Sequence, residues 1–232
     1  MVSILVLGFM MGMRHALDAD HVAAVAALST RSESWRANAV RGSAWGLGHM
    51  LMLSAVGGLC LLFETAVSEQ WARRLELAAG VMLLVLGGDL LWRLVRRRIH
   101  VHAHRHDDGT VHLHAHGHSP EERHDPQRHE HEHPEGFPLR ALAIGGVHGL
   151  AGSAALLLVA LHQIGSFWRG LAYIGIFGLG SILGMTLLSV VIAIPLRASA
   201  RWLTGVHQGV ELTIALATLG VGWWVLSGLW AG

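Results

Sequence analysis

The chain has 232 residues, of which 52% are hydrophobic and only 14% charged, whereas soluble domains are about one quarter charged. The formal net charge is +1 and all 17 basic residues are arginine, so the net charge predicts no nucleic-acid partner. The single cysteine, Cys60, excludes an intrachain disulfide and lacks the spacing of a thiolate metal site.

The first apolar segment, residues 4–28, is long enough to cross a bilayer as one helix. Five ionisable residues lie inside it, namely Arg14, His15, Asp18, Asp20 and His21. Ionisable groups are costly in hydrocarbon and mark ion or proton pathways. Because these charges interrupt the apolar core and no clean small-residue cleavage site follows, we expect the segment to be retained rather than removed as a signal peptide.

Five further apolar segments follow, and a polar stretch near residues 96–138 divides the six into three and three. The six segments are 4–28, 40–63, 75–95, 139–162, 171–195 and 207–230. This pattern predicts an all-α membrane protein with six transmembrane helices. The expected organisation is a first three-helix repeat at 1–98, a disordered His-rich loop at 99–138 and a second three-helix repeat at 139–232.

The two halves resemble each other in sequence. A shift of 133 positions, with one residue of slip in places, aligns histidine, tryptophan, arginine and glycine residues of the two halves. The aligned groups are His15 with His148, Trp35-Arg36 with Trp168-Arg169, and Gly46-Leu47-Gly48 with Gly178-Leu179-Gly180; Glu76-Leu77 aligns with Glu211-Leu212 at a shift of 135. Since each half has an odd number of spans, the second must enter the membrane from the opposite side. We therefore predict inverted repeats, a transporter architecture with its site near the midplane.

Arginine placement predicts the orientation. The loops after the first, third and fifth spans carry ten arginines, and those after the second and fourth carry three. The arginine-rich side is expected to be cytoplasmic. Both termini then face outside, and the long central loop faces the cytoplasm of a bacterial inner-membrane protein.

Six side chains are candidate metal ligands, namely His15, Asp18, Asp20, His21, His49 and His148. Imidazoles and carboxylates together suit a borderline divalent transition metal. Counting residues along the helices puts His21, His49 and His148 at one depth and His15 about 9 Å further toward the centre. On one continuous helix Asp20 points almost opposite to Asp18. Either Asp20 makes another contact, or the helix is distorted and all four ligands of the first segment converge.

Two acidic residues near the ends of their spans, Asp89 and Glu211, are expected to be solvated or paired rather than part of a site. Between His100 and His133 lie 12 of the 18 histidines, mixed with acidic residues. Low apolar content predicts a loop that is disordered without metal. Its alternating imidazoles suit nickel, zinc, cobalt or copper with little selectivity.

With these residues in hand, the chain resembles the nickel/cobalt transporter superfamily, whose hallmark His-x4-Asp-His is matched by His15, Asp20 and His21. Gly48-His49 resembles a second motif of the family, and the segment 145–153 resembles compact, six-span members of the urease-accessory type. The resemblance implies transport of Ni²⁺ or Co²⁺ as substrate, with no prosthetic group. It also implies metallochaperones or urease and hydrogenase maturation proteins as partners. Classical uptake permeases of the family have eight spans, so uptake and efflux both stay open, with uptake slightly favoured.

Other functions are weaker. No Walker motif Gly-x4-Gly-Lys-Ser/Thr is present in the sequence, so a secondary transporter is expected rather than an ATPase. Six spans with Ser153 and His207 are similar to a rhomboid-type intramembrane serine protease, but Ala154 replaces the glycine of its Gly-x-Ser-Gly context and the depths differ. A bis-histidine haem protein would leave Asp18 and Asp20 without a role. We therefore expect a transporter and no enzyme.

Overall fold

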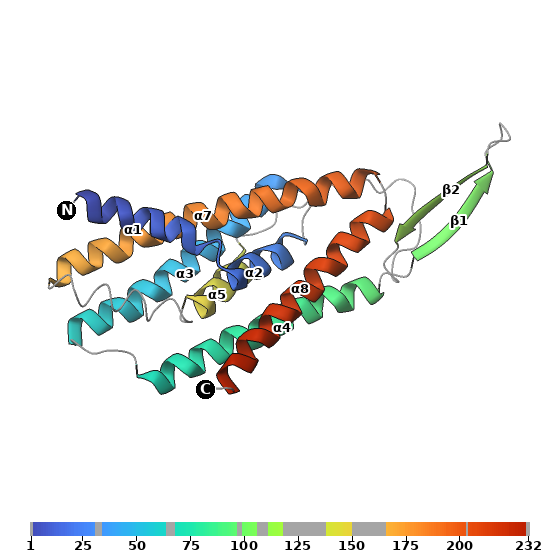
Figure 1. Ribbon diagram of the computed structural model, residues 1–232. Helices are drawn as coiled ribbons and strands as arrows, with labels where there is room; N and C mark the ends of the chain where they lie inside the picture. Colours follow the sequence, from blue (N-terminus) through green and yellow to red (C-terminus); the bar gives the residue numbers. More distant parts are fainter. Residues whose placement is uncertain are drawn as a thin grey trace.

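The computed structural model describes residues 2–30, 34–63, 68–96, 99–105, 111–117, 138–149, 166–202 and 204–230. Within these residues the protein has seven helices and one two-stranded sheet (Figure 1). The elements are α1 (Val2–His15), α2 (Ala19–Ser29), α3 (Trp35–Phe63), α4 (Glu69–Arg96), β1 (Ile99–Arg105), β2 (Val111–Gly117), α5 (Leu139–His148), α7 (Phe167–Trp202) and α8 (Thr204–Trp230). The helical class predicted from the sequence is confirmed for most of the described chain.

Four of the helices, α3, α4, α7 and α8, are long and apolar enough to cross a membrane. They contain the predicted segments 40–63, 75–95, 171–195 and 207–230. Their outward faces carry large exposed apolar side chains, such as Leu51, Val85 and Val191. A soluble protein rarely exposes so much apolar surface, and lipid is the medium that suits it.

The segment 4–28 is a broken helix, which is one of the two alternatives that its sequence left open. Helix α1 ends at His15 and α2 begins at Ala19. At 1.5 Å per residue they are about 21 and 16 Å long, so neither alone spans the hydrocarbon core of about 30 Å. The break lies where Asp18 adopts an extended backbone (φ −62°, ψ 145°) at the N-cap of α2, a position at which aspartate is favoured.

Only part of the fourth predicted segment, 139–162, belongs to the described residues. Its first ten residues form α5, which ends at His148 and is followed by Gly149. Ser153 and His162 lie outside the described residues, so the six-helix count stays a prediction.

Two helix pairs make closest contact through glycine. A Cβ added to Gly12 of α1 would lie 2.0 Å from the carbonyl oxygen of Phe177 in α7, and one added to Gly145 of α5 would lie 2.0 Å from that of Trp45 in α3. Only glycine permits backbones to approach this closely, which is how small residues hold membrane helices together. The α1–α7 contact also includes a hydrogen bond from the Ser181 hydroxyl to the Gly12 carbonyl oxygen (3.2 Å).

The contacts fix the relative direction of the helices. In the α1–α7 pair, Gly8 faces Tyr173 and Ala16 faces Gly184, so the two helices are parallel.

The α3–α5 pair is parallel as well, since Trp45 faces Gly145 and His49 faces Gly149. Helices α3 and α7 are antiparallel, because Gly42 faces Ser189 while Met50 faces Gly178. Consequently α1 and α5, the first helices of the two halves, run in opposite directions.

Helix α2 lies inside the bundle, and seven of its eleven residues are buried. The hydroxyl of Thr218 in α8 donates to the Ala23 carbonyl oxygen (3.3 Å), and the Arg93 guanidinium of α4 donates to the Thr30 hydroxyl (3.4 Å). These contacts, with α4 packed against α8, hold the short helix between the longer ones. The cluster of ligand-type residues begins at its N-terminus.

The His-rich stretch contains an antiparallel hairpin where the sequence predicts a disordered loop. Strands β1 and β2 extend away from the helices in Figure 1. The pairing sets His100 opposite His116, His102 opposite His114 and His104 opposite His112. The physical reason is the strict alternation of histidine with other, mostly apolar, residues in both stretches, which is the period of a β-strand. The remainder of 99–138, apart from Pro138, lies outside the described residues.

Candidate metal centre

The break between α1 and α2 brings together side chains that a continuous helix would separate. Six residues of helix place their Cα atoms about 9 Å apart along the axis, yet the ring centroids of His15 and His21 are 4.2 Å apart. The turn is closed by backbone hydrogen bonds from the Leu17 N–H to the Arg14 carbonyl and from the Asp18 N–H to the His15 carbonyl. Of the two alternatives left open by the sequence, distortion of the helix is the one observed.

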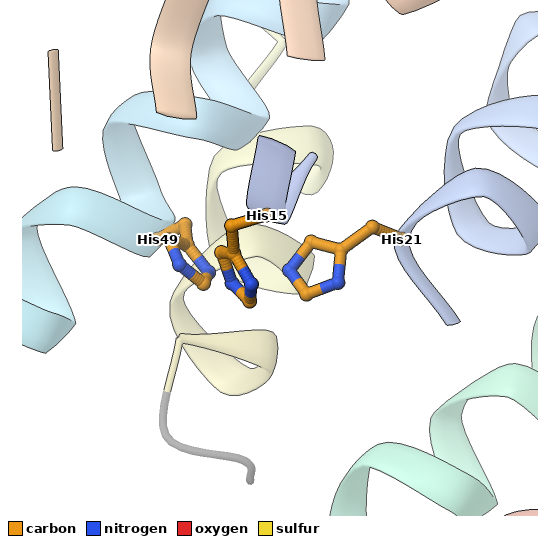
Figure 2. A group of neighbouring side chains, drawn as sticks. All are labelled: His15, His21 and His49. Atoms are coloured by element: carbon orange, nitrogen blue, oxygen red, sulfur yellow. The ribbon is translucent and has the colours of Figure 1, made fainter. Parts of the chain in front are cut away.

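Three imidazoles from three helices form the first group of potential ligands. His15 ends α1, His21 lies in the first turn of α2, and His49 comes from the middle of α3. Figure 2 shows the three rings side by side. Their centroids lie 4.2 Å apart for His15 and His21, 5.2 Å for His15 and His49, and 5.3 Å for His21 and His49. One nitrogen from each ring lies within 4.8 Å of the others. We call these residues the three-histidine group.

A second group lies next to the first and shares His21 with it. The Asp20 carboxylate lies between two rings, with Oδ1 2.9 Å from Nδ1 of His21 and Oδ2 2.9 Å from Nε2 of His148. The His21 backbone N–H also donates to Oδ1. Ligand atoms of Asp20, His21 and His148 all lie within 4.8 Å of one another. We call these three residues the aspartate group.

Asp18 belongs to neither group. Its carboxylate instead lies 2.7 Å from Nδ1 of His15, and its side chain is half exposed. A carboxylate that accepts the Nδ1 proton fixes the imidazole tautomer and leaves the Nε2 lone pair for a metal. Of the two candidate aspartates, Asp20 is therefore the one that lies within a group of ligand-type residues, and Asp18 pairs with His15.

The buried ring nitrogens test whether the residues fit a metal ion. All four histidines are buried. Among the described residues, Nε2 of His15, Nε2 of His21, Nδ1 of His148 and both nitrogens of His49 have no hydrogen-bond partner. Buried polar atoms without partners are costly, so a purely structural role explains these histidines poorly. Imidazole nitrogens supplemented by one carboxylate are a donor set that binds divalent transition metals.

Two aromatic residues that the sequence analysis missed line the cluster. Trp45 is completely buried, with its ring 5.4 Å from that of His21 and 5.6 Å from that of His148. Phe177 of α7 lies 5.5 Å from the His15 ring. The spacing of Trp45 and His49 is i, i+4, which places both on one face of α3 and could have identified the tryptophan from sequence.

Asp89 and Glu211 are both paired, as predicted. Asp89 accepts from the Arg93 guanidinium at 3.2 Å. Glu211 is buried, 3.6 Å from Nε2 of His207. The Nδ1 atom of His207 lies 3.1 Å from the Ser199 hydroxyl, and nothing in the described part of the chain relates this histidine to a protease.

The fold and the cluster together define a class. Four membrane-length apolar helices surround a buried set of histidines and a carboxylate at a helix break, so the chain is a multi-pass membrane protein. It is 32% identical over 224 residues to the urease accessory protein UreH of Bacillus sp. (strain TB-90), an alignment that covers 94% of this chain and 89% of the relative. The chain belongs to the UreH family. No family model and no solved structure matches it.

Proposed function

We propose that the protein carries Ni²⁺ or Co²⁺ across the membrane as a secondary transporter. The observation that carries the proposal is the gathering of His15, His21, His49, His148 and Asp20 at the break between α1 and α2. Broken helices that expose ligands inside a helical bundle are typical of transporter substrate sites. The ion here is the transported substrate and not a resident cofactor.

The donor set favours this class of ion. Magnesium and calcium prefer oxygen ligands, whereas imidazole suits nickel, cobalt, zinc and copper. The His15-x4-Asp20-His21 motif, which resembles the hallmark of the nickel/cobalt transporter superfamily, points to nickel or cobalt within that range. The chemistry of the ligands alone does not reject zinc or copper, so competition between metals belongs in the test.

We further propose that the two halves are inverted three-helix repeats. The close contacts support this, because they repeat under the sequence shift. The contact of Gly12 with Phe177 corresponds to that of Gly145 with Trp45. Gly12 and Gly145 are 133 positions apart, and Trp45 and Phe177 are 132 apart.

The reverse contacts correspond too. A Cβ added to Gly180 would lie 2.2 Å from the Phe9 carbonyl oxygen, and one added to Gly48 would lie 2.0 Å from that of Leu142. Each first helix thus packs on the second helix of the other half, and α1 and α5 run in opposite directions.

The third helices of the two halves show the same reciprocity. A Cβ on Gly87 of α4 would lie 3.1 Å from the Ala215 carbonyl oxygen of α8, and one on Gly222 would lie 3.1 Å from that of Gly80. The shift of 135 that aligns Glu76 with Glu211 also aligns Gly87 with Gly222 and Gly80 with Ala215. The two contacts are therefore equivalent, with the halves exchanged. A pseudo-two-fold axis relating the halves accounts for all of these contacts together.

We infer an inner-membrane location with both termini outside and the His-rich loop in the cytoplasm, from the distribution of arginine. Uptake is favoured slightly over efflux. The loop would then collect the ion where it leaves the protein, and cytoplasmic metallochaperones or urease and hydrogenase maturation proteins are the expected recipients.

Vesicles of known orientation test the proposal. Purified protein reconstituted into liposomes should move labelled Ni²⁺ or Co²⁺ faster than protein-free liposomes, and inside-out and right-side-out vesicles should give the direction. An excess of unlabelled Zn²⁺ or Cu²⁺ that abolishes the flux would identify a broader substrate range. Flux equal to that of empty liposomes for every metal would contradict the proposed function.

Three substitutions test the site within the same assay. His15→Ala, Asp20→Ala and His21→Ala should each abolish the flux at unchanged membrane abundance, because each removes a potential ligand from the cluster. His207→Ala, a histidine outside both groups, is the matched control and should transport normally. Normal flux in all three cluster variants would show that the ion does not pass this site.

A further inference from the structure

We propose that the ion occupies two successive positions in this site, and that the two positions share His21 as a common ligand. The three-histidine group is the first position and the aspartate group is the second. This inference rests on the proposed transport function. It divides one cluster into a relay, which neither the sequence motif nor the UreH relative indicates.

The geometry of His21 carries the inference. Its Nδ1 atom lies 2.9 Å from Asp20 Oδ1, within the aspartate group. Its Nε2 atom has no hydrogen-bond partner among the described residues, and Figure 2 shows a ring nitrogen of His21 turned toward His15. The two nitrogens of the His21 ring therefore belong to two different groups of potential metal ligands.

A neutral imidazole has one lone pair and one N–H. When Nε2 binds an ion in the three-histidine group, Nδ1 carries the proton and donates it to Asp20. When Nδ1 binds an ion in the aspartate group, the proton must reside on Nε2. One ring thus supports one position at a time, so each chain should hold one ion and not two.

The two positions differ in which parts of the chain build them. The first uses α1, α2 and α3, all from the half before the His-rich loop. The second adds His148 of α5, from the half after it. Movement of α5 relative to α2 would make or break the second position and leave the first intact. The transfer of the ion around His21 is then the step that couples binding to alternating access.

The ligands also differ in charge. The three-histidine group offers only neutral nitrogens, whereas the aspartate group adds the Asp20 carboxylate. A carboxylate is the harder ligand, and it offsets part of the charge of a divalent cation. The second position is therefore the stronger one electrostatically, but it forms only when Asp20 releases at least one of the two imidazoles with which it now pairs.

Binding measurements on the purified full chain separate the positions. Because loop histidines also bind nickel, the twelve histidines of residues 100–133 are first changed to asparagine. In that background, Ni²⁺ titration followed by calorimetry and X-ray absorption is compared for the parent, His49→Ala, His148→Ala and His21→Ala. His207→Ala serves as the control.

The relay predicts one bound Ni²⁺ per chain in the parent, in His49→Ala and in His148→Ala. The affinity should stay close to that of the parent in His49→Ala, which keeps the stronger position, and should fall in His148→Ala, which keeps only the weaker one. Outer-shell scattering should count three imidazoles on nickel in His148→Ala and two in His49→Ala. His21→Ala should lose binding at both positions. Both single-position variants should bind nickel yet show flux at background level.

Two results would overturn the relay. Equal loss of binding in all three variants would indicate a single composite site, and two Ni²⁺ per parent chain would contradict the shared lone pair. The flux assay tests the transport function separately. If that function is wrong, liposomes that contain the parent protein move no metal, while the binding titrations still decide between one position and two.

Discussion

Replacing Gly145 by alanine should inactivate the site without touching a ligand. Gly145 lies one turn before His148 in α5, and a Cβ there would lie 2.0 Å from the Trp45 carbonyl oxygen. Ordinary contact begins at 3.4 Å, so α5 and α3 would have to separate by about 1.4 Å. Both partners of the close contact are held in helices, and the oxygen belongs to the backbone, so no side-chain rotation relieves it.

The displacement is large compared with the tolerance of the aspartate group. The His148 Nε2 atom lies 2.9 Å from Asp20 Oδ2, and a shift of that size would carry the pair beyond the hydrogen-bond limit of about 3.5 Å. Loss of a group that positions a metal ligand costs about 10–100-fold in affinity or activity. We expect Ni²⁺ flux to fall by that factor in Gly145→Ala.

The adjacent glycine provides a matched control. A Cβ on Gly146 would meet nothing closer than the Gly48 carbonyl oxygen at 3.8 Å, which is an ordinary contact. Alanine is about 1 kcal/mol better than glycine within a helix, so neither substitution weakens α5 itself.

The assay is reconstituted Ni²⁺ flux at equal protein abundance, with gel-filtration profiles to confirm that both variants fold. Wild-type flux in Gly145→Ala, or an equal loss in Gly146→Ala, would refute the reasoning that backbone contact between α3 and α5 sets the position of His148.

Three further outcomes are expected. His148→Ala should weaken Ni²⁺ binding less than His21→Ala, because His21 belongs to both ligand groups; titration of the purified variants checks this, and the reverse order would contradict the shared ligand. Deletion of residues 100–133, which lie outside the described helices, should change the apparent affinity for Ni²⁺ or metal tolerance but leave flux measurable; complete loss in a well-expressed deletion would place the loop in the pathway. Reporter fusions should report both termini outside and residue 115 inside, and a cytoplasmic N-terminus would reverse the proposed orientation.

The sequence predicted the long helices well, because uninterrupted apolar runs of more than twenty residues have few other structures in lipid. It did not decide between a continuous and a distorted helix at residues 16–18, because apolar content and length are compatible with a continuous one. The N-cap preference of Asp18 was the local signal for the break, but charged residues in a membrane segment were interpreted first as ligands. Here Asp18 is the N-cap of α2, and its carboxylate pairs with His15.

The hairpin was missed for a different reason. Composition alone makes the stretch after residue 98 too polar for a packed core, which favours disorder. The alternation of histidine with other residues in Ile99–Arg105 and Val111–Gly117 predicts two strands instead. This signal depends on the order of the residues, which composition does not record. The proximity of His49 and His148 to the first motif followed from counting depth along the helices, whereas Trp45 and Phe177 needed the packing of α3 and α7.

Two helices end at the cluster, and this has an electrostatic consequence that no side chain supplies. The peptide dipoles of a helix sum to roughly half a negative elementary charge at its C-terminus. Both α1 and α5 end at a histidine of the cluster, His15 and His148, so two negative helix ends converge on the cluster from opposite halves. The positive N-terminus of α2 opposes them, and the Asp20 carboxylate in its first turn offsets that end. The backbone would therefore keep an electric field that attracts cations and repels anions even in a chain whose imidazoles had been replaced.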